Sequence, residues 1–157
     1  MKGKVVGDKL NEGRVAIVTG AGSGAGEAIA LALAGKGARV TAIGRRLAPL
    51  EALAAQDDRI IAVSADVTDA DAMAAAIAEA VEKNGAPTIV IANAGSAESA
   101  PFQRTDAALF RATLDVNLAG VFNTFQASFV KMNRAQPGRL IAIASTAGLK
   151  GYAYVSA

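Results

Sequence analysis

A glycine-rich turn is the first part of the sequence whose residue types and spacing suggest a chemical role. Residues 20–26 contain four glycines and stand between an apolar run and a helical pattern. Glycines let a phosphate group approach the backbone, and the start of a helix offers free N–H groups and the positive end of its dipole. We therefore expect a pyrophosphate to bind here; the alternative is a tight turn that binds nothing. The predicted binding residues are Gly20, Gly22, Ser23, Gly24, Ala25 and Gly26.

Polar residues also follow three later apolar runs of the sequence. Asp66-Val67 comes after the third run, Asn93-Ala94-Gly95 after the fourth, and Ser145 ends the fifth. In a parallel sheet the ligand sits beyond the carboxyl ends of the strands, so all three places are candidates for contact with it. Each also has a simpler interpretation: a turn before a helix cap for Asp66, and ordinary loops for the other two.

Short apolar runs alternate with stretches of helical spacing along the chain. The runs predict strands at residues 14–19, 39–43, 60–64, 88–92 and 140–144. Helical spacing predicts helices at residues 27–36, 47–55, 68–84 and 105–134. The alternation implies an α/β protein with a doubly wound parallel sheet of five strands. We expect one domain from residue 14, preceded by a polar tail at residues 1–13.

The last predicted helix is unusually rich in aromatic residues. It holds four of the five Phe residues, and Phe122 and Val130 widen its apolar stripe. A helix that is apolar on more than one side is either deeply buried or used in association. Both interpretations stay open for this helix, since different faces can serve different purposes.

The glycine-rich turn fits two known patterns. Gly20-x-Gly22-x-x-Ala25 matches the general dinucleotide-binding fingerprint of the Rossmann fold. Thr19-Gly20-x-x-x-Gly24-x-Gly26 resembles the TGxxxGxG pattern of the short-chain dehydrogenase/reductase family. Asp66-Val67 is similar to the adenine-binding pair of that family. Asn93-Ala94-Gly95 resembles its NNAG motif, with Ala92 in place of the first Asn.

The resemblance covers the chain from about residue 14 onward and extends to catalytic positions. Asn117 resembles the Asn of the catalytic tetrad, and Ser145 resembles the catalytic Ser; taken alone, Asn117 is equally a polar residue on a solvent face. In this family the Ser hydroxyl binds the substrate oxygen, and the Asn helps to hold a water. A Tyr, with a Lys four residues later, acts as general acid or base. The resemblance thus implies an oxidoreductase that moves a hydride between nicotinamide and a carbonyl or alcohol.

The catalytic Tyr and Lys of the family fall outside the sequence. Family spacing puts the Tyr thirteen residues after Ser145, at position 158, and the sequence ends at Ala157. Tyr152 and Tyr154 are expected to be loop or substrate-side aromatics, because no Lys stands four residues after Tyr152. We expect the protein to continue past Ala157 into the C-terminal part of the family fold. The alternative is a nucleotide-binding fragment without catalysis.

The end of the second predicted strand indicates which cofactor binds. NAD-binding sites usually carry an Asp or Glu there for the ribose 2′-hydroxyl. This sequence has Gly44 at that point, followed by Arg45 and Arg46. An Arg can pair with a 2′-phosphate, and no acid is present to repel it, so NADP(H) is favoured over NAD(H). The alternative is two solvated arginines, and Ser23 argues weakly against NADP(H), because many relatives that prefer it have a basic residue there.

Other classes of function and partner fit the sequence less well. A methyltransferase that binds S-adenosylmethionine is the third hypothesis, but it gives no reason for Asn93-Ala94-Gly95, Asn117 and Ser145 to occur together. Residues 96–102 and 147–154 are expected to line the pocket of a small carbonyl or alcohol substrate. The resemblance also implies a homodimer or homotetramer, formed through the Phe-rich helix.

Composition removes several kinds of site. The chain has no His and no Cys, which excludes disulfides, Cys/His zinc sites and a Ser-His-Asp triad within it. The net charge of +2 and the scattered basic residues argue against nucleic-acid binding. No apolar run approaches the ~18 residues of a membrane helix. We expect no metal and no membrane partner, and a cytoplasmic location.

Overall fold

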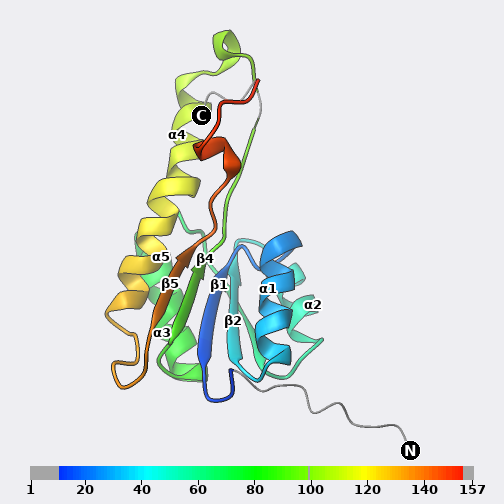
Figure 1. The fold of residues 1–157 in the computed structure, drawn as a ribbon, viewed down its shortest axis with the longest axis vertical. Helices are drawn as coiled ribbons and strands as arrows, with labels where there is room; N and C mark the ends of the chain where they lie inside the picture. Colours follow the sequence, from blue (N-terminus) through cyan, green and yellow to red (C-terminus); the bar gives the residue numbers. More distant parts are fainter. Residues whose placement is uncertain (1–10, 99, 154–157) are drawn as a thin grey trace, which may run out of the picture.

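The computed structural model describes residues 11–98 and 100–153, and these form one parallel five-stranded sheet with helices on both faces (Figure 1). The spatial order of the strands is β3-β2-β1-β4-β5. The strands are β1 Val15–Thr19, β2 Arg39–Gly44, β3 Ile60–Ser64, β4 Ile89–Ala92 and β5 Arg139–Ala142. This confirms the predicted α/β, doubly wound parallel sheet of five strands. Most of the predicted tail, at residues 1–10, and Tyr154 lie outside the described residues.

Alternate residues of the central strands point to opposite faces, and each face is covered. Ala16 and Val18 of β1 pack with α1, while Ile17 packs with α3 on the other side. All five residues of β1 are buried, as the continuous apolar run predicts for a strand with two covered faces. The sheet therefore forms the centre of two apolar clusters.

The first three helices lie close to their predicted positions. They are α1 Gly24–Gly35, α2 Leu47–Ala54 and α3 Ala70–Asn84. Asp69 caps α3, since its side chain accepts a hydrogen bond from the N–H of Ala72. The first helix begins at Gly24, three residues before the predicted start, because the glycine-rich turn itself forms the first turn of α1. The glycines that are predicted to bind a pyrophosphate thus lie at the N-terminus of a helix.

The single helix predicted at residues 105–134 is wrong in detail. The structure has α4 Ala107–Leu114, a π-helical turn at Asp115–Ala119, and α5 Gly120–Phe129. In the π-helical turn the N–H of Gly120 bonds to the carbonyl of Asp115, five residues back. Such a turn inserts one extra residue into a helix, and the spacing of apolar side chains barely changes as a result. The helix also ends five residues early.

The C-terminal half of the structure extends beyond the sheet and also forms one of its edges. At the top of Figure 1, α4 and the segment after β5 extend beyond the carboxyl ends of the strands. The fifth strand lies at the sheet edge, and all of its residues are exposed. Among the residues that the structure describes, no helix has the length and apolar character needed to cross a membrane.

Candidate nucleotide-binding site

A cavity of about 330 Å³ opens where the strand order reverses between β1 and β4. Such a position is where parallel sheets of this kind hold their ligands, and the volume lies in the usual range of roughly 300–1,000 Å³. The carboxyl ends of β1 to β4 all contribute to its wall. The lining residues are Gly20, Gly22, Ser23, Gly44, Arg45, Arg46, Pro49, Ala65, Asp66, Val67, Asn93, Ala94, Gly95, Ser96 and Val116.

Most of the residues predicted from sequence meet at this cavity. All of the predicted cofactor-binding residues line it except Gly24, Ala25 and Gly26. These three form the first turn of α1, directly after the lining residue Ser23. The structure therefore brings the four separated motifs to one place, as the parallel sheet predicts.

Glycine is required at three positions of the turn for different physical reasons. Gly20 has φ +66° and packs so closely on the segment after β4 that a Cβ would lie 2.7 Å from the Cα of Ala94. A Cβ on Gly26 would overlap the carbonyl oxygen of Gly20. Gly24 has φ +59°, which disfavours any other residue, and open space beside it. Two glycines thus allow close packing, and one leaves the turn open to a ligand.

The start of α1 has free hydrogen-bond donors. The side chain of Ser23, at the N-cap, makes no capping hydrogen bond. The first N–H groups of a helix have no partner within the helix, so they require another acceptor. Together with the open turn, these donors fit the oxygens of a pyrophosphate.

Thr19 and Asn93 tie the ends of β1 and β4 together. The hydroxyl oxygen of Thr19 accepts hydrogen bonds from the N–H of Asn93, at 3.1 Å, and of Ala94, at 3.2 Å. The side-chain amide of Asn93 donates to the carbonyl of Thr19 at 3.0 Å. Asn93 is therefore a fixed part of the cavity wall.

Arg45 lies at the mouth of the cavity, directly after β2. Its guanidinium nitrogen lies 4.0 Å from a carboxylate oxygen of Asp66, and 73% of its side chain is exposed. The hydroxyl of Ser64 donates to the carbonyl of Arg45 at 3.2 Å, which holds the backbone but leaves the guanidinium accessible. Gly44 is the last residue of β2, so the strand end carries no acid.

Asp66 starts a turn and also faces the cavity. Its Oδ1 accepts hydrogen bonds from the backbone N–H and the hydroxyl of Thr68. The backbone N–H of Thr68 is the main reason that the pKa of the Asp66 carboxyl lies below its ordinary value. The Thr68 hydroxyl and the Arg45 charge lower that pKa further, against partial burial, which raises it. Asp66 thus has a structural contact in the turn and also lines the cavity.

Asn117 lies in the π-helical turn and holds the rim of the cavity. Its Oδ1 accepts from the N–H of Ser96 at 2.9 Å, and its Nδ2 donates to the carbonyl of Ser96 at 2.7 Å. A side chain that is bonded twice to a loop backbone fixes that loop. Asn117 is exposed, and both ends of its side-chain amide are nevertheless bonded to this loop.

Ser145 lies three residues past β5, exposed, at the same edge of the sheet as the cavity. Its hydroxyl oxygen accepts from the N–H of Ala147 at 3.1 Å. Tyr152, close by in sequence, donates its hydroxyl hydrogen to the Oγ1 of Thr146. Neither Ser145 nor Asn117 is among the residues that line the cavity.

Three contributors to this site escape sequence reasoning. Thr19 bonds to Asn93, Ser64 supports Arg45, and Asn123 of α5 donates to the carbonyl of Val67 at 2.9 Å. Their common function is to hold the backbone of a lining residue. Only Thr19 carries a signal, as part of the TGxxxGxG pattern; a polar residue inside an apolar helix, such as Asn123, gives no hint of its distant partner.

Comparison with known proteins agrees with the motifs. The model of the family described as short chain dehydrogenase matches residues 14–157. An uncharacterized oxidoreductase of Myxococcus xanthus is 38% identical over 144 residues, and D-threitol dehydrogenase of Mycolicibacterium smegmatis is 39% identical over 140 residues. These matches include 89% and 87% of this chain, but only 57% and 54% of the two relatives.

A solved structure agrees as well. The crystal structure of a protein from Sinorhizobium meliloti 1021, assigned as a short-chain alcohol dehydrogenase, superimposes with a TM-score of 0.86 at 33% identity. The match covers 92% of this chain and 59% of that one. With the glycine-rich turn, the strand order and the family match in agreement, this chain belongs to the short-chain dehydrogenase family.

Proposed function

We propose that the cavity binds NADP(H), and that the full-length protein is an oxidoreductase acting on a carbonyl/alcohol pair. The observation that carries the proposal is the cavity at the β1–β4 crevice, where a glycine-rich turn and Arg45 lie on one wall. When bound, the nicotinamide ring supplies or accepts the hydride. The residues of the protein would bind the cofactor and the substrate, orient them and keep water away from them.

The glycine-rich turn and the first turn of α1 would together hold the phosphates. Gly22 and Ser23 line the cavity, and the uncapped N–H groups of Gly24, Ala25 and Gly26 follow directly in α1. Backbone donors at a helix N-terminus stabilise anions without a long, mobile side chain. Asn93, Ala94 and Gly95 would form the floor on which the nucleotide rests.

Arg45 supports the preference for NADP(H). The guanidinium is largely exposed and has five N–H donors, of which Asp66 can occupy only one edge. The remaining donors can grip a 2′-phosphate in the charge-assisted, two-point manner typical of Arg. Arg46 also lines the cavity and adds positive charge. Because β2 ends in Gly44, no carboxylate there repels the phosphate.

Ser145 and Asn117 are the proposed contributors to the chemical step. The Ser145 hydroxyl would donate a hydrogen bond to the substrate oxygen. Asn117 would help to keep a water in place while it fixes Ser96 at the rim. The general acid–base Tyr of the family is expected thirteen residues after Ser145, so turnover is to be measured on the full-length protein.

The names of similar proteins support an alcohol or carbonyl as the substrate class. Relatives include D-threitol dehydrogenase, galactitol 2-dehydrogenase and (-)-trans-carveol dehydrogenase, each 36–39% identical to this chain. Since the chain covers less than two thirds of each of these relatives, the substrate of the full-length protein is part of the proposal.

The α4–α5 surface supports a homo-oligomer. Several large apolar side chains of α4, α5 and the π-helical turn between them are exposed on the described chain: Phe110, Leu114, Leu118, Phe122 and Phe129. Apolar patches of this kind are typical of contact surfaces. We propose that α4 and α5 pack against a second copy, giving a homodimer or homotetramer.

The experiment is a calorimetric titration of the purified chain with NADPH, NADH and S-adenosylmethionine. We expect saturable binding of NADPH, weaker binding of NADH and none of S-adenosylmethionine. Binding of S-adenosylmethionine in place of NADPH would replace the oxidoreductase proposal by the methyltransferase one. Ser145→Ala in the full-length enzyme should lower turnover far more than cofactor affinity; unchanged turnover would remove Ser145 from the mechanism.

A further inference from the structure

We propose that Asn123, on α5, is a positioning residue that orients the Asp66 carboxylate for recognition of the adenine amino group. The inference rests on the proposed function, because it concerns the adenine end of the proposed cofactor. It assigns a purpose to a side chain that lies outside the cavity and is not part of any motif.

The first observation is a polar contact between distant parts of the chain. Asn123 Nδ2 donates a hydrogen bond of 2.9 Å to the carbonyl oxygen of Val67, 56 residues away in sequence. Asn123 is half-buried, and its hydrogen bond supplies the Val67 carbonyl with a donor. An α5 side chain thus holds the segment that follows β3.

The second observation is how closely α5 approaches that segment. At Gly120, one helical turn before Asn123 and Thr124, a Cβ would lie 2.6 Å from the Cγ2 of Val67. Only a glycine at this position lets the helix come near enough for the Asn123 hydrogen bond. Gly120 and Asn123 therefore act on the same residue from the same helix.

The contact is transmitted to Asp66 through one peptide group. The peptide that joins Val67 to Thr68 is held at its C=O by Asn123 and at its N–H by Asp66 Oδ1. A peptide group is rigid and planar, so fixing its oxygen also fixes the direction of its N–H. Together with the Thr68 hydroxyl, which donates to the same oxygen, that N–H sets where the Asp66 carboxylate lies. Asn123, the peptide and Asp66 form a continuous hydrogen-bonded chain.

The orientation of Asp66 matters because a carboxylate is an acceptor only. An adenine offers a 6-amino donor, whereas hypoxanthine has a carbonyl oxygen at the same place. A correctly placed carboxylate therefore favours adenine and rejects hypoxanthine, since the latter leaves two acceptors facing each other. Loss of orientation should reduce this discrimination while the phosphate contacts at the glycine-rich turn persist.

The test compares NADPH with its hypoxanthine analogue by calorimetric titration. In the wild-type chain we expect NADPH to bind more tightly. In Asn123→Ala the ratio of the two dissociation constants should fall by about fivefold, in line with the loss of one neutral hydrogen bond. Asn123→Asp keeps the size of the side chain but lacks the donor, so it should give the same loss.

Asn133→Ala is the matched control. Asn133 also bonds to a nearby backbone group, the N–H of Ala135, but it lies outside the cavity lining. It should leave the ratio unchanged. If Asn123→Ala and Asn123→Asp, each folded by circular dichroism, keep the wild-type ratio, Asn123 does not position Asp66. If the wild-type chain binds neither nucleotide, the proposed function itself fails, and this inference with it.

Discussion

Asn93 donates two hydrogen bonds to Thr19 across the β1–β4 crevice. Its backbone N–H donates to the Thr19 hydroxyl oxygen at 3.1 Å, and its side-chain amide donates to the Thr19 carbonyl at 3.0 Å. The pair closes the sheet at the point where the strand order reverses, so it fixes the floor of the proposed cofactor site. It links the first motif of the sequence to one more than seventy residues later.

Thr19→Val tests the energetic value of this pair. Val has nearly the same shape but no hydroxyl, so the partly buried N–H groups of Asn93 and Ala94 lose their acceptor. We expect a loss of about 1–3 kcal/mol in the free energy of unfolding, measured in urea. Thr124→Val is the control, because the buried Thr124 hydroxyl bonds only within its own helix. Equal losses in both variants would mean that the crevice pair adds no more stability than a hydroxyl bonded within a helix.

Gly26→Ala tests the packing of the glycine-rich turn. The added Cβ would overlap the carbonyl oxygen of Gly20, so the turn must shift. We expect a loss of about 1–3 kcal/mol in stability and a marked loss of NADPH binding. Gly35→Ala, in the same helix, meets nothing within 4 Å and should keep stability or raise it by up to about 1 kcal/mol. If Gly26→Ala binds NADPH like wild type, the turn does not cradle the phosphates.

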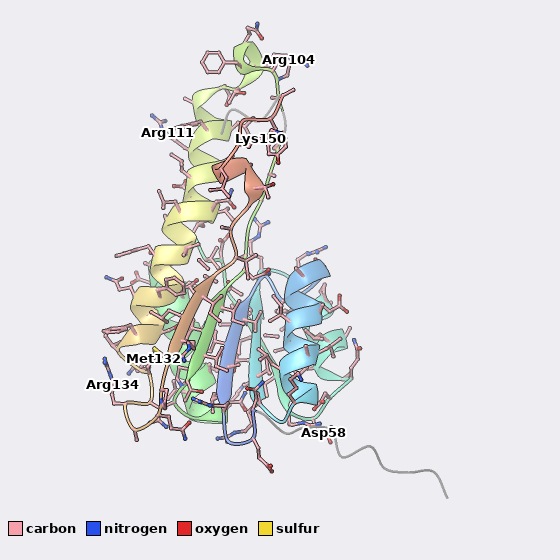
Figure 2. All side chains as sticks on the ribbon, in the orientation of Figure 1. Asp58, Arg104, Arg111, Met132, Arg134 and Lys150 are labelled. Carbon is pink, nitrogen blue, oxygen red and sulfur yellow. The ribbon has the colours of Figure 1, made fainter. Side chains whose placement is uncertain are left out.

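Arg45→Gln tests the basis of cofactor choice. If the guanidinium pairs with the 2′-phosphate, its loss should weaken NADPH binding by about 10- to 100-fold and NADH binding by far less. Arg111→Gln makes the same change of charge on α4, where Arg111 projects from the helix above the sheet (Figure 2), and should leave both affinities unchanged. Equal weakening of NADPH and NADH by Arg45→Gln would show that Arg45 does not contact the 2′-phosphate.

The preference for NADPH should depend on pH in a defined window. The pKa of the Asp66 carboxyl lies below its ordinary value, so this carboxylate stays ionised above pH 5. The chain has no His that could titrate between pH 5 and 7. Any stability that Asp66 adds is therefore present above its unfolded pKa and lost only as pH falls through its lower folded value. The 2′-phosphate, with a second pKa of about 6, is then the group that titrates. Binding of NADPH relative to NADH should strengthen several-fold from pH 5 to 7; a flat ratio would contradict pairing of the dianion with Arg45.

Elements with strong local signals were predictable from sequence. The strand at residues 60–64 has the predicted bounds, and β1, β2 and β4 differ by one residue at one end, because continuous apolar runs leave a buried strand little choice. The glycine-rich turn and its meeting with Asp66 and Asn93 follow from the parallel order of the strands. Local periodicity and a known topology thus suffice for the outline of the site.

What escaped prediction depends on tertiary geometry. The π-helical turn at Asp115–Ala119 adds one residue that periodicity does not register. The hydrogen bond from Asn123 to Val67 joins residues 56 apart, and no pattern along either segment reports on the other. The Arg45–Asp66 contact likewise requires β2 and β3 to lie side by side. Side chains that position a site are therefore harder to find than the residues that line it.

The most direct test of cofactor binding in the β1–β4 crevice is a titration of the chain with NADPH, followed by backbone amide NMR shifts. We predict saturable shifts that centre on Ser23, Arg45, Val67 and Asn93. Shifts absent at millimolar NADPH, or confined to a second hollow that Phe129, Met132 and Leu140 help to line, would contradict binding in the crevice.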